Sequence, residues 1–105
     1  MLFRSASTVV LAACDLTSNS LSFNGNDAVE LVCGGTPLDV IGQIGFQPAA
    51  EWGTPPTSTL NATLRRRCGI TAGDPDGTNA FAPEVQWVGF AVDTFTGLGA
   101  PGCAP

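Results

Sequence analysis

The 105-residue chain contains no histidine, no lysine and no tyrosine. Histidine is the commonest general base and the usual protein ligand of transition metals. Its absence excludes Ser-His-Asp and Cys-His catalysis and every metal centre built on imidazole. No apolar stretch approaches the roughly 20 residues that a membrane-spanning helix needs. These gaps favour a binding or structural protein over an enzyme, and we predict no catalytic residue, no metal site and no cofactor.

Charge is scarce and mostly acidic, because nine Asp and Glu residues face four arginines for a net charge of −5. A negative surface repels nucleic acids and anionic membranes. In a strand, Arg65 and Arg67 share one face and Arg66 points the other way. We therefore expect Arg65 and Arg67 to offer only a weak contact for an anion such as phosphate. The main predicted role of the Arg65–Arg67 cluster is pairing with acids of neighbouring strands. The candidate partners are Glu30, Asp39 and Glu51.

The backbone is rich in turn-forming residues, with 13 glycines and 8 prolines, while 44% of the residues are apolar. No segment shows sustained helical periodicity. This combination favours many short strands joined by tight turns. We predict an all-β sandwich forming one domain over residues 1–105, with a tail at residues 100–105.

A β-hairpin is the clearest local prediction. Asn24–Asp27 is a dense turn signal, and Ala28–Cys33 alternates loosely between two faces. Gly34–Gly35 suits a two-residue turn because glycine accepts positive φ. Leu38–Gly42 would be the second strand, with Val40 on the face towards the core.

Four cysteines without a C-x-x-C motif indicate two disulfides and an oxidising compartment, so the expected location is extracellular or at the cell surface. Three pairings are possible. Cys33 and Cys68 each end a predicted strand, which favours a Cys33–Cys68 bridge and leaves Cys14–Cys103 to join the two ends of the chain. Four reduced, buried cysteines are the alternative.

Five segments, in order along the chain, resemble the lamin-tail domain in the form attached to large secreted bacterial nucleases and cell-surface proteins. They are FNGNDAVEL (23–31), DVIGQIG (39–45), EWG (51–53), STLNATLRRR (58–67) and W-x-x-F-A-x-D-T-F-x-x-L-G from Trp87 to Gly99. The resemblance implies an immunoglobulin-like β-sandwich that acts as a non-catalytic accessory module. It implies other domains of the same polypeptide, such as a nuclease or phosphoesterase, as partners. Nucleic acid or a cell-surface polymer would be bound only weakly.

The first residues allow three interpretations. Leu11–Cys14 matches a bacterial lipoprotein processing box, which would make Cys14 a lipid anchor. Ser7–Ala13 reads as a strand that pairs with Ala28–Cys33, and we prefer this interpretation. Leu2–Ser5 looks like translated sequencing-adapter DNA, which implies a truncated reading frame and makes residues 1–5 artefactual or disordered.

Two segments carry weak ligand signals. Gly73–Asn79 crowds two acids into a turn like a calcium loop, but it lacks the closing carboxylate, so we predict an ordinary turn. Trp52 lies in a Pro-flanked loop and is the aromatic residue expected to be exposed for stacking on a sugar or base. The alternative functions are an autonomous extracellular protein that binds polysaccharide or calcium, and a small lipoprotein anchored through Cys14.

Overall fold

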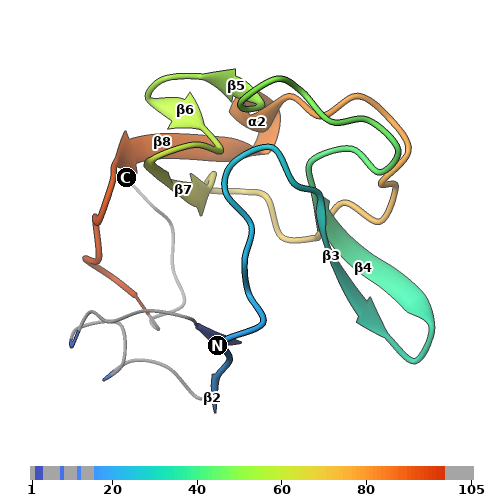
Figure 1. The fold of residues 1–105 in the computed structure, drawn as a ribbon, viewed down its shortest axis with the longest axis horizontal. Helices are drawn as coiled ribbons and strands as arrows, with labels where there is room; N and C mark the ends of the chain where they lie inside the picture. Colours follow the sequence, from blue (N-terminus) through green and yellow to red (C-terminus); the bar gives the residue numbers. More distant parts are fainter. Residues whose placement is uncertain (1, 4–7, 9–11, 13–15, 99–105) are drawn as a thin grey trace.

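The computed structural model describes residues 2–3, 8, 12 and 16–98, in which strands and turns dominate (Figure 1). The strands are β1 (Leu2–Phe3), β2 (Leu16–Thr17), β3 (Val29–Cys33), β4 (Thr36–Ile41), β5 (Gly53–Thr54), β6 (Thr57–Ser58), β7 (Ala62–Arg66) and β8 (Trp87–Ala91). A short helix, α2 (Pro83–Gln86), precedes β8 and begins at a buried proline, whose fixed φ suits the first helical position. The all-β class predicted from composition is therefore confirmed.

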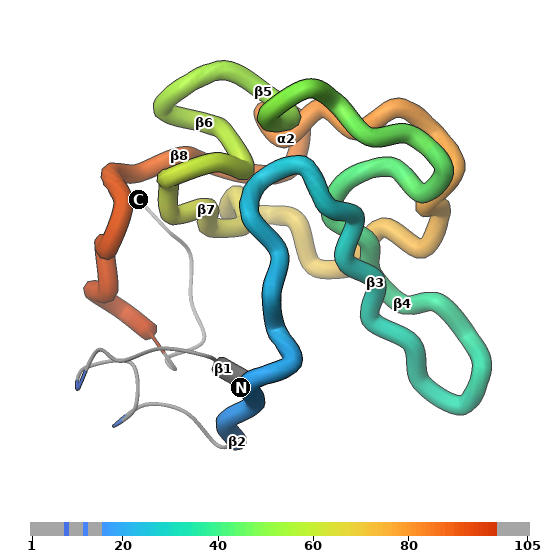
Figure 2. The backbone as a smooth tube through the Cα atoms, in the orientation of Figure 1, coloured from blue at the N-terminus to red at the C-terminus, as the bar shows by residue number. Residues whose placement is uncertain are grey.

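The strands pair two by two. β1 and β2 are parallel, whereas β3–β4, β5–β6 and β7–β8 are antiparallel pairs. Within the described ranges these pairs do not merge into larger sheets. Figure 2 shows the β5–β6 hairpin lying along β8, while the β3–β4 hairpin projects away from the rest of the chain.

Gly89 of β8 allows the turn between β5 and β6 to approach the β8 backbone closely. A Cβ atom at Gly89 would lie 2.0 Å from the carbonyl oxygen of Pro56. The backbone N–H of Gly89 donates to Thr57 Oγ1 at 3.2 Å. Only glycine leaves room for this contact, which fixes β6 over β8.

The β3–β4 hairpin has the predicted turn. Gly34 and Gly35 adopt φ values of 57° and 80°, and two consecutive positive φ values are typical of the turns whose twist suits a tight hairpin. The second strand begins at Thr36, two residues earlier than predicted. A β-bulge, which the sequence did not reveal, leaves Leu38 without an opposing residue between the Leu31–Asp39 and Val32–Pro37 pairs.

Val40 and Trp52 form the buried hydrophobic core of the described residues, with exposed fractions of 1% and 6%. The expected exposure of Trp52 is therefore wrong. Its ring meets Phe81 edge to face at a centroid distance of 6.1 Å. Its backbone N–H donates to Thr59 Oγ1 at 3.0 Å, so the Pro-flanked loop folds inward and carries the ring with it.

The cysteine predictions can be compared with the structure at Cys33 and Cys68, which are both exposed. Cys33 carries a free, exposed thiol, and no disulfide joins it to Cys68 within the described part of the chain. The reason is its position at the tip of the projecting hairpin, away from the end of β7 where Cys68 follows (Figure 1). Cys14 and Cys103 lie outside the described residues.

The N-terminal segment differs from the preferred interpretation where it can be compared. Thr8 and Ala12 are the described residues of Ser7–Ala13, and both are helical rather than extended. Leu2 and Phe3 form β1. The rest of residues 1–5, most of the Leu11–Cys14 box and residues 100–105 lie outside the described residues.

Candidate functional site

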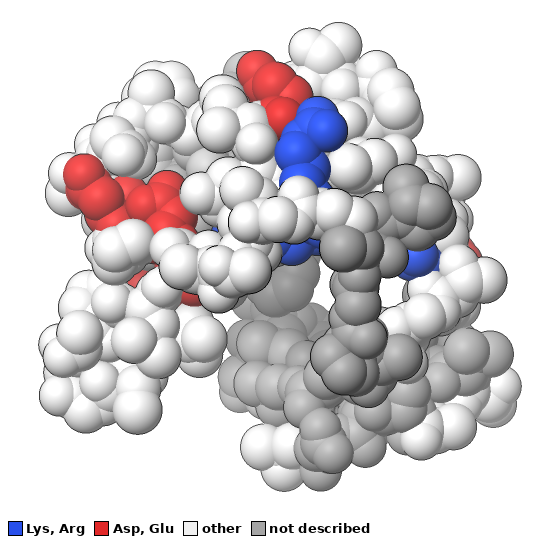
Figure 3. Space-filling model, turned by 180° about the vertical axis from the view of Figure 1, so that it is seen from behind, with Lys and Arg blue, Asp and Glu red and all other residues white. Residues whose placement is uncertain are grey.

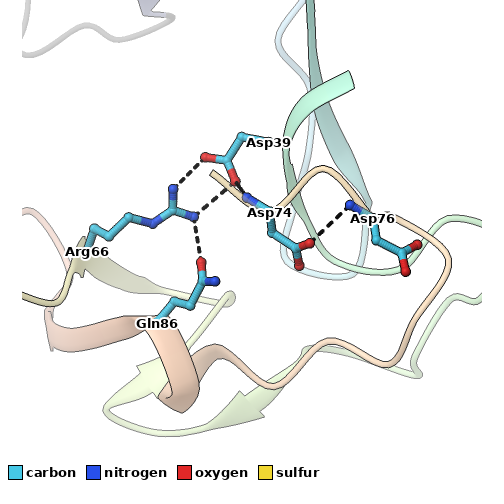
Figure 4. A network of polar contacts seen from close by, with 5 residues as sticks. All are labelled: Asp39, Arg66, Asp74, Asp76 and Gln86. Carbon is cyan, nitrogen blue, oxygen red and sulfur yellow. Dashed lines mark hydrogen bonds and ion pairs between the residues drawn. The ribbon is translucent and has the colours of Figure 1, made fainter. Parts of the chain in front are cut away.

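A polar network centred on Arg66 joins three elements (Figure 4). From the end of β7, the Arg66 guanidinium donates to both carboxylate oxygens of Asp39 in β4, at 2.7 and 3.0 Å. Its Nη2 also donates to Gln86 Oε1 of α2 at 3.0 Å. Bidentate pairing of this kind is the strongest geometry for an arginine and a carboxylate. The network therefore ties the projecting hairpin to β7 and α2.

The indole ring of Trp87 also holds the Arg66 guanidinium in place. The two residues are opposite each other in the β7–β8 register, and the guanidinium carbon lies 4.3 Å from the centre of the indole ring. Such cation–π contacts add roughly 0.5–2 kcal/mol. Both Arg66 Nε and Trp87 Nε1 are buried without a hydrogen-bond partner among the described residues. Both Nη atoms of Arg66 are thus engaged within the fold.

Arg65 and Arg67, the predicted anion contacts, are held separately. The Arg65 guanidinium lies 4.9 Å from the Phe90 ring centre and donates to the carbonyl and hydroxyl oxygens of Thr96. Arg67 is exposed, and its Nε donates to the Glu84 carbonyl at 3.1 Å. In Figure 3 arginine atoms appear as separate spots rather than one patch. Anion contact by Arg65 and Arg67 stays a prediction.

Of the three acids expected to pair with the arginines, Asp39 does so. Glu51 instead accepts a hydrogen bond from the Ser58 hydroxyl. Glu30 is exposed on β3. Pairing of the basic cluster with a predicted acid is therefore confirmed for Arg66 and Asp39, whose nearest atoms are 2.7 Å apart. The two strands that carry them, β7 and β4, belong to different two-stranded sheets and are not neighbours in one sheet.

The acidic loop of Gly73–Asn79 contains a turn at Gly77–Thr78, near the place where the sequence predicts one. The Asp76 N–H donates to Asp74 Oδ1 at 3.1 Å, and the Thr78 N–H donates to Asp76 Oδ1 at 3.0 Å. The hydrogen bonds from Thr78, first its hydroxyl and then its backbone N–H, hold the pKa of Asp76 below its ordinary value. Within residues 16–98 and the few described before them, no three Cys, Asp or Glu side chains gather as metal ligands.

The Asp39 carboxylate is stabilised in its charged form. Burial is the largest single influence on its pKa and raises it, but several attractions together outweigh burial. These are the hydrogen bonds from Arg66 and from the Asp74 N–H, at 2.8 Å, the positive charge of Arg66, and the hydrogen bond from the Val40 N–H. The pKa of Asp39 therefore lies below its ordinary value of 3.8.

This shift predicts acid sensitivity. Because the pKa is lower in the folded chain, the charged carboxylate stabilises the fold fully above 3.8, and this stabilisation is lost as pH falls through the lowered value. We expect Asp39→Asn to cost about 1–3 kcal/mol at neutral pH and to flatten the acid side of the stability profile. Urea titrations across pH would measure both effects. Asp93→Asn, at an exposed acid, is the control, and an unchanged acid slope in Asp39→Asn would contradict the assignment.

The β3–β4 hairpin presents a group of exposed apolar side chains. Leu31 is 61% exposed, and Val32 and Leu38 are each nearly half exposed. Val29 adds to this surface at the base of the hairpin. Figure 3 shows the hairpin from behind as the lower-left lobe, without charged side chains towards its tip. Alternation in the sequence suggested a core face here, because it does not reveal that the hairpin projects.

The chain yields no match to protein-family models, to curated proteins or to solved structures. The lamin-tail resemblance therefore depends on the five sequence segments. In the described residues, no helix combines the length and the apolar character needed to cross a bilayer.

Proposed function

We propose that this chain is a non-catalytic binding module of a larger secreted or cell-surface protein. One observation carries the proposal: the charged network is engaged inside the fold, while the projecting hairpin offers uncovered apolar side chains. Asp39 and Arg66 neutralise each other, and Asp74 and Asp76 hold a turn. Because these charged groups are bonded to other groups of the fold, they are not free to transfer protons. The fold is therefore suited to binding a partner rather than to acid–base catalysis.

The lamin-tail resemblance supports an accessory role and gives the finer fold proposal, an immunoglobulin-like sandwich. The FNGNDAVEL segment (23–31) contains a bend and the first three residues of β3, and the segment from Trp87 begins with β8. Other domains of the same polypeptide are the proposed partners, and the absence of histidine from the sequence supports a function without catalysis. The even number of cysteines supports an extracellular location.

An autonomous polysaccharide-binding protein is the second candidate. A hollow of about 300 Å³ is lined by Asp74, Asn79, Phe81 and Gln86, together with small apolar residues. Carboxylate and amide groups beside an aromatic ring are suited to the hydroxyls and apolar faces of a sugar. Titration with soluble polysaccharides, with Gln86→Ala as the test variant, would distinguish this candidate from the accessory module.

The proposed function predicts no hydrolysis of nucleic acids by the purified chain. The reason is chemical, because it has neither histidine nor the positive surface that holds a polyanion near a reacting group. The measurement is incubation with labelled DNA and RNA in the presence of magnesium or calcium, compared with buffer. Turnover that an Asp74→Asn substitution abolishes would contradict the proposal, whereas salt-sensitive binding without cleavage would agree with it.

A further inference from the structure

The two edges of the β3–β4 hairpin differ. The outer edge of β4 is closed by the segment around Gly73, where a Cβ atom would lie 2.3 Å from the carbonyl oxygen of Leu38. Pro37 in β4 lacks a backbone N–H and blunts the same edge. The other edge, along β3, pairs with no strand of the described residues. Among the described strands, β3 is therefore the open edge of the hairpin.

The open edge has backbone groups to offer. In a hairpin with a two-residue turn, the residues that flank the turn bond to each other, and alternate residues point their N–H and C=O groups outward. Because Cys33 pairs with Thr36 next to the turn, the outward residues of β3 are Val32 and Glu30. The strand contains neither proline nor glycine, so an added strand would meet no interruption along it.

The side chains beside this edge combine apolar surface with negative charge. Leu31 is 61% exposed on one face. On the Glu30 side, an open hollow is lined by Asp27 and Glu30 together with Ile44 and Phe46. Ile44 and Phe46 are 47% and 57% exposed. A strand that covered this edge would bury aliphatic surface and meet two carboxylates.

We propose that the β3 edge binds an extended segment of another protein in which aliphatic and basic residues alternate. The segment adds to the sheet as a third strand, with its backbone bonded to Val32 and Glu30. Its aliphatic side chains cover Val29 and Leu31, and a basic side chain enters the hollow beside Asp27 and Glu30. The inference rests on the proposed function, because it names the partner chemistry of the binding module.

Charge decides between this partner and a second copy of the chain. Each chain carries a net charge of −5 and has no lysine, so two copies repel each other at long range. The described arginines already bond inside the fold, as in the Arg66–Asp39 pair. Among its described residues, a second copy therefore offers no arginine that is not already bonded in its own fold, whereas a basic strand brings unpaired cations to the hollow beside Glu30.

The test measures binding of three labelled heptapeptides to the full 105-residue chain by fluorescence anisotropy. The first alternates Val and Lys, the second alternates Val and Glu, and the third is the Val/Lys peptide with N-methyl groups on alternate backbone nitrogens. We expect the Val/Lys peptide to bind at least tenfold more tightly than either of the others. Equal binding of the N-methylated peptide would show charge attraction without strand addition, which would overturn the proposal.

Variants locate the site. Glu30→Lys should reverse the preference between the Lys and Glu peptides, and Leu31→Thr should weaken binding severalfold while keeping a residue that favours strands. Glu84→Lys makes the same charge change at an exposed residue elsewhere and should leave binding unchanged. Circular dichroism checks that each variant is folded, and loss of the preference in Glu84→Lys as well as Glu30→Lys would overturn the location.

Two other results would also overturn the inference. One is no binding of any peptide, and the other is a dimer in sedimentation that Leu31→Thr dissociates, because a second copy would then occupy the edge. Neither result bears on the accessory function, which is contradicted by nucleic-acid turnover in the separate hydrolysis assay. Failure of the strand-binding inference can therefore be distinguished from failure of the proposed accessory function.

Discussion

Replacing Val40 with Asp is expected to lower the free energy of unfolding by about 3–5 kcal/mol. Val40 is 1% exposed, and Gly77 passes so close that a Cβ atom there would lie 3.2 Å from Val40 Cγ2. A carboxylate at this position would be buried without a partner and would lose its hydration. Because small domains are stable by about 5–15 kcal/mol, the loss should appear as a large drop in the melting temperature.

Val32→Asp is the matched control for this experiment. It introduces the same side chain in place of the same residue type, on the same hairpin, at a position that is 48% exposed. We expect a change of only about 0.5 kcal/mol, as is usual for surface substitutions. Equal melting temperatures for the Val40→Asp variant and the unmodified chain would show that the register of β4 is incorrect.

Trp52→Ala should destabilise the chain by about 3–5 kcal/mol, the usual cost of removing a large buried aromatic side chain. The indole packs edge to face against Phe81 and covers Gly42, where a Cβ atom would lie 2.8 Å from the ring. Removing the indole would leave a cavity beside Phe81 and Gly42. Denaturant titration followed by circular dichroism would measure the loss without relying on tryptophan fluorescence.

Phe46→Ala provides the comparison, because Phe46 is an aromatic residue of similar size that is 57% exposed. It should cost far less than Trp52→Ala. If the two variants were equally stable, Trp52 would not belong to the core, and the exposure expected from the sequence would be correct after all.

The hairpin shows what the sequence alone could predict. The Gly34–Gly35 turn and the burial of Val40 follow from local rules, because positive φ and alternation are properties of short segments. The bulge at Leu38 does not follow from such rules. It accompanies the approach of Gly73, a contact between residues 35 positions apart that no local pattern encodes.

Trp52 and the arginines show the same limit in the site. A Pro-flanked loop indicated exposure, but the position of Trp52 is decided by Phe81 and Thr59, which lie farther along the chain. Alternation separates Arg65 from Arg66 within β7, whereas Arg67 follows the end of the strand. The choice of Asp39 as the partner of Arg66 depends on the way β4 is placed beside β7, and composition cannot supply that geometry.

The tip of the β3–β4 hairpin is also a place where the chain can be lengthened. No atom lies within 4 Å of the position that a Cβ would take at either Gly34 or Gly35. Exposed loop tips of this kind tolerate insertions best. A peptide tag, a fluorophore site or a whole guest domain could therefore be grafted between these two glycines, leaving Val40 and Trp52 undisturbed and making the hairpin an attachment arm for immobilising the protein.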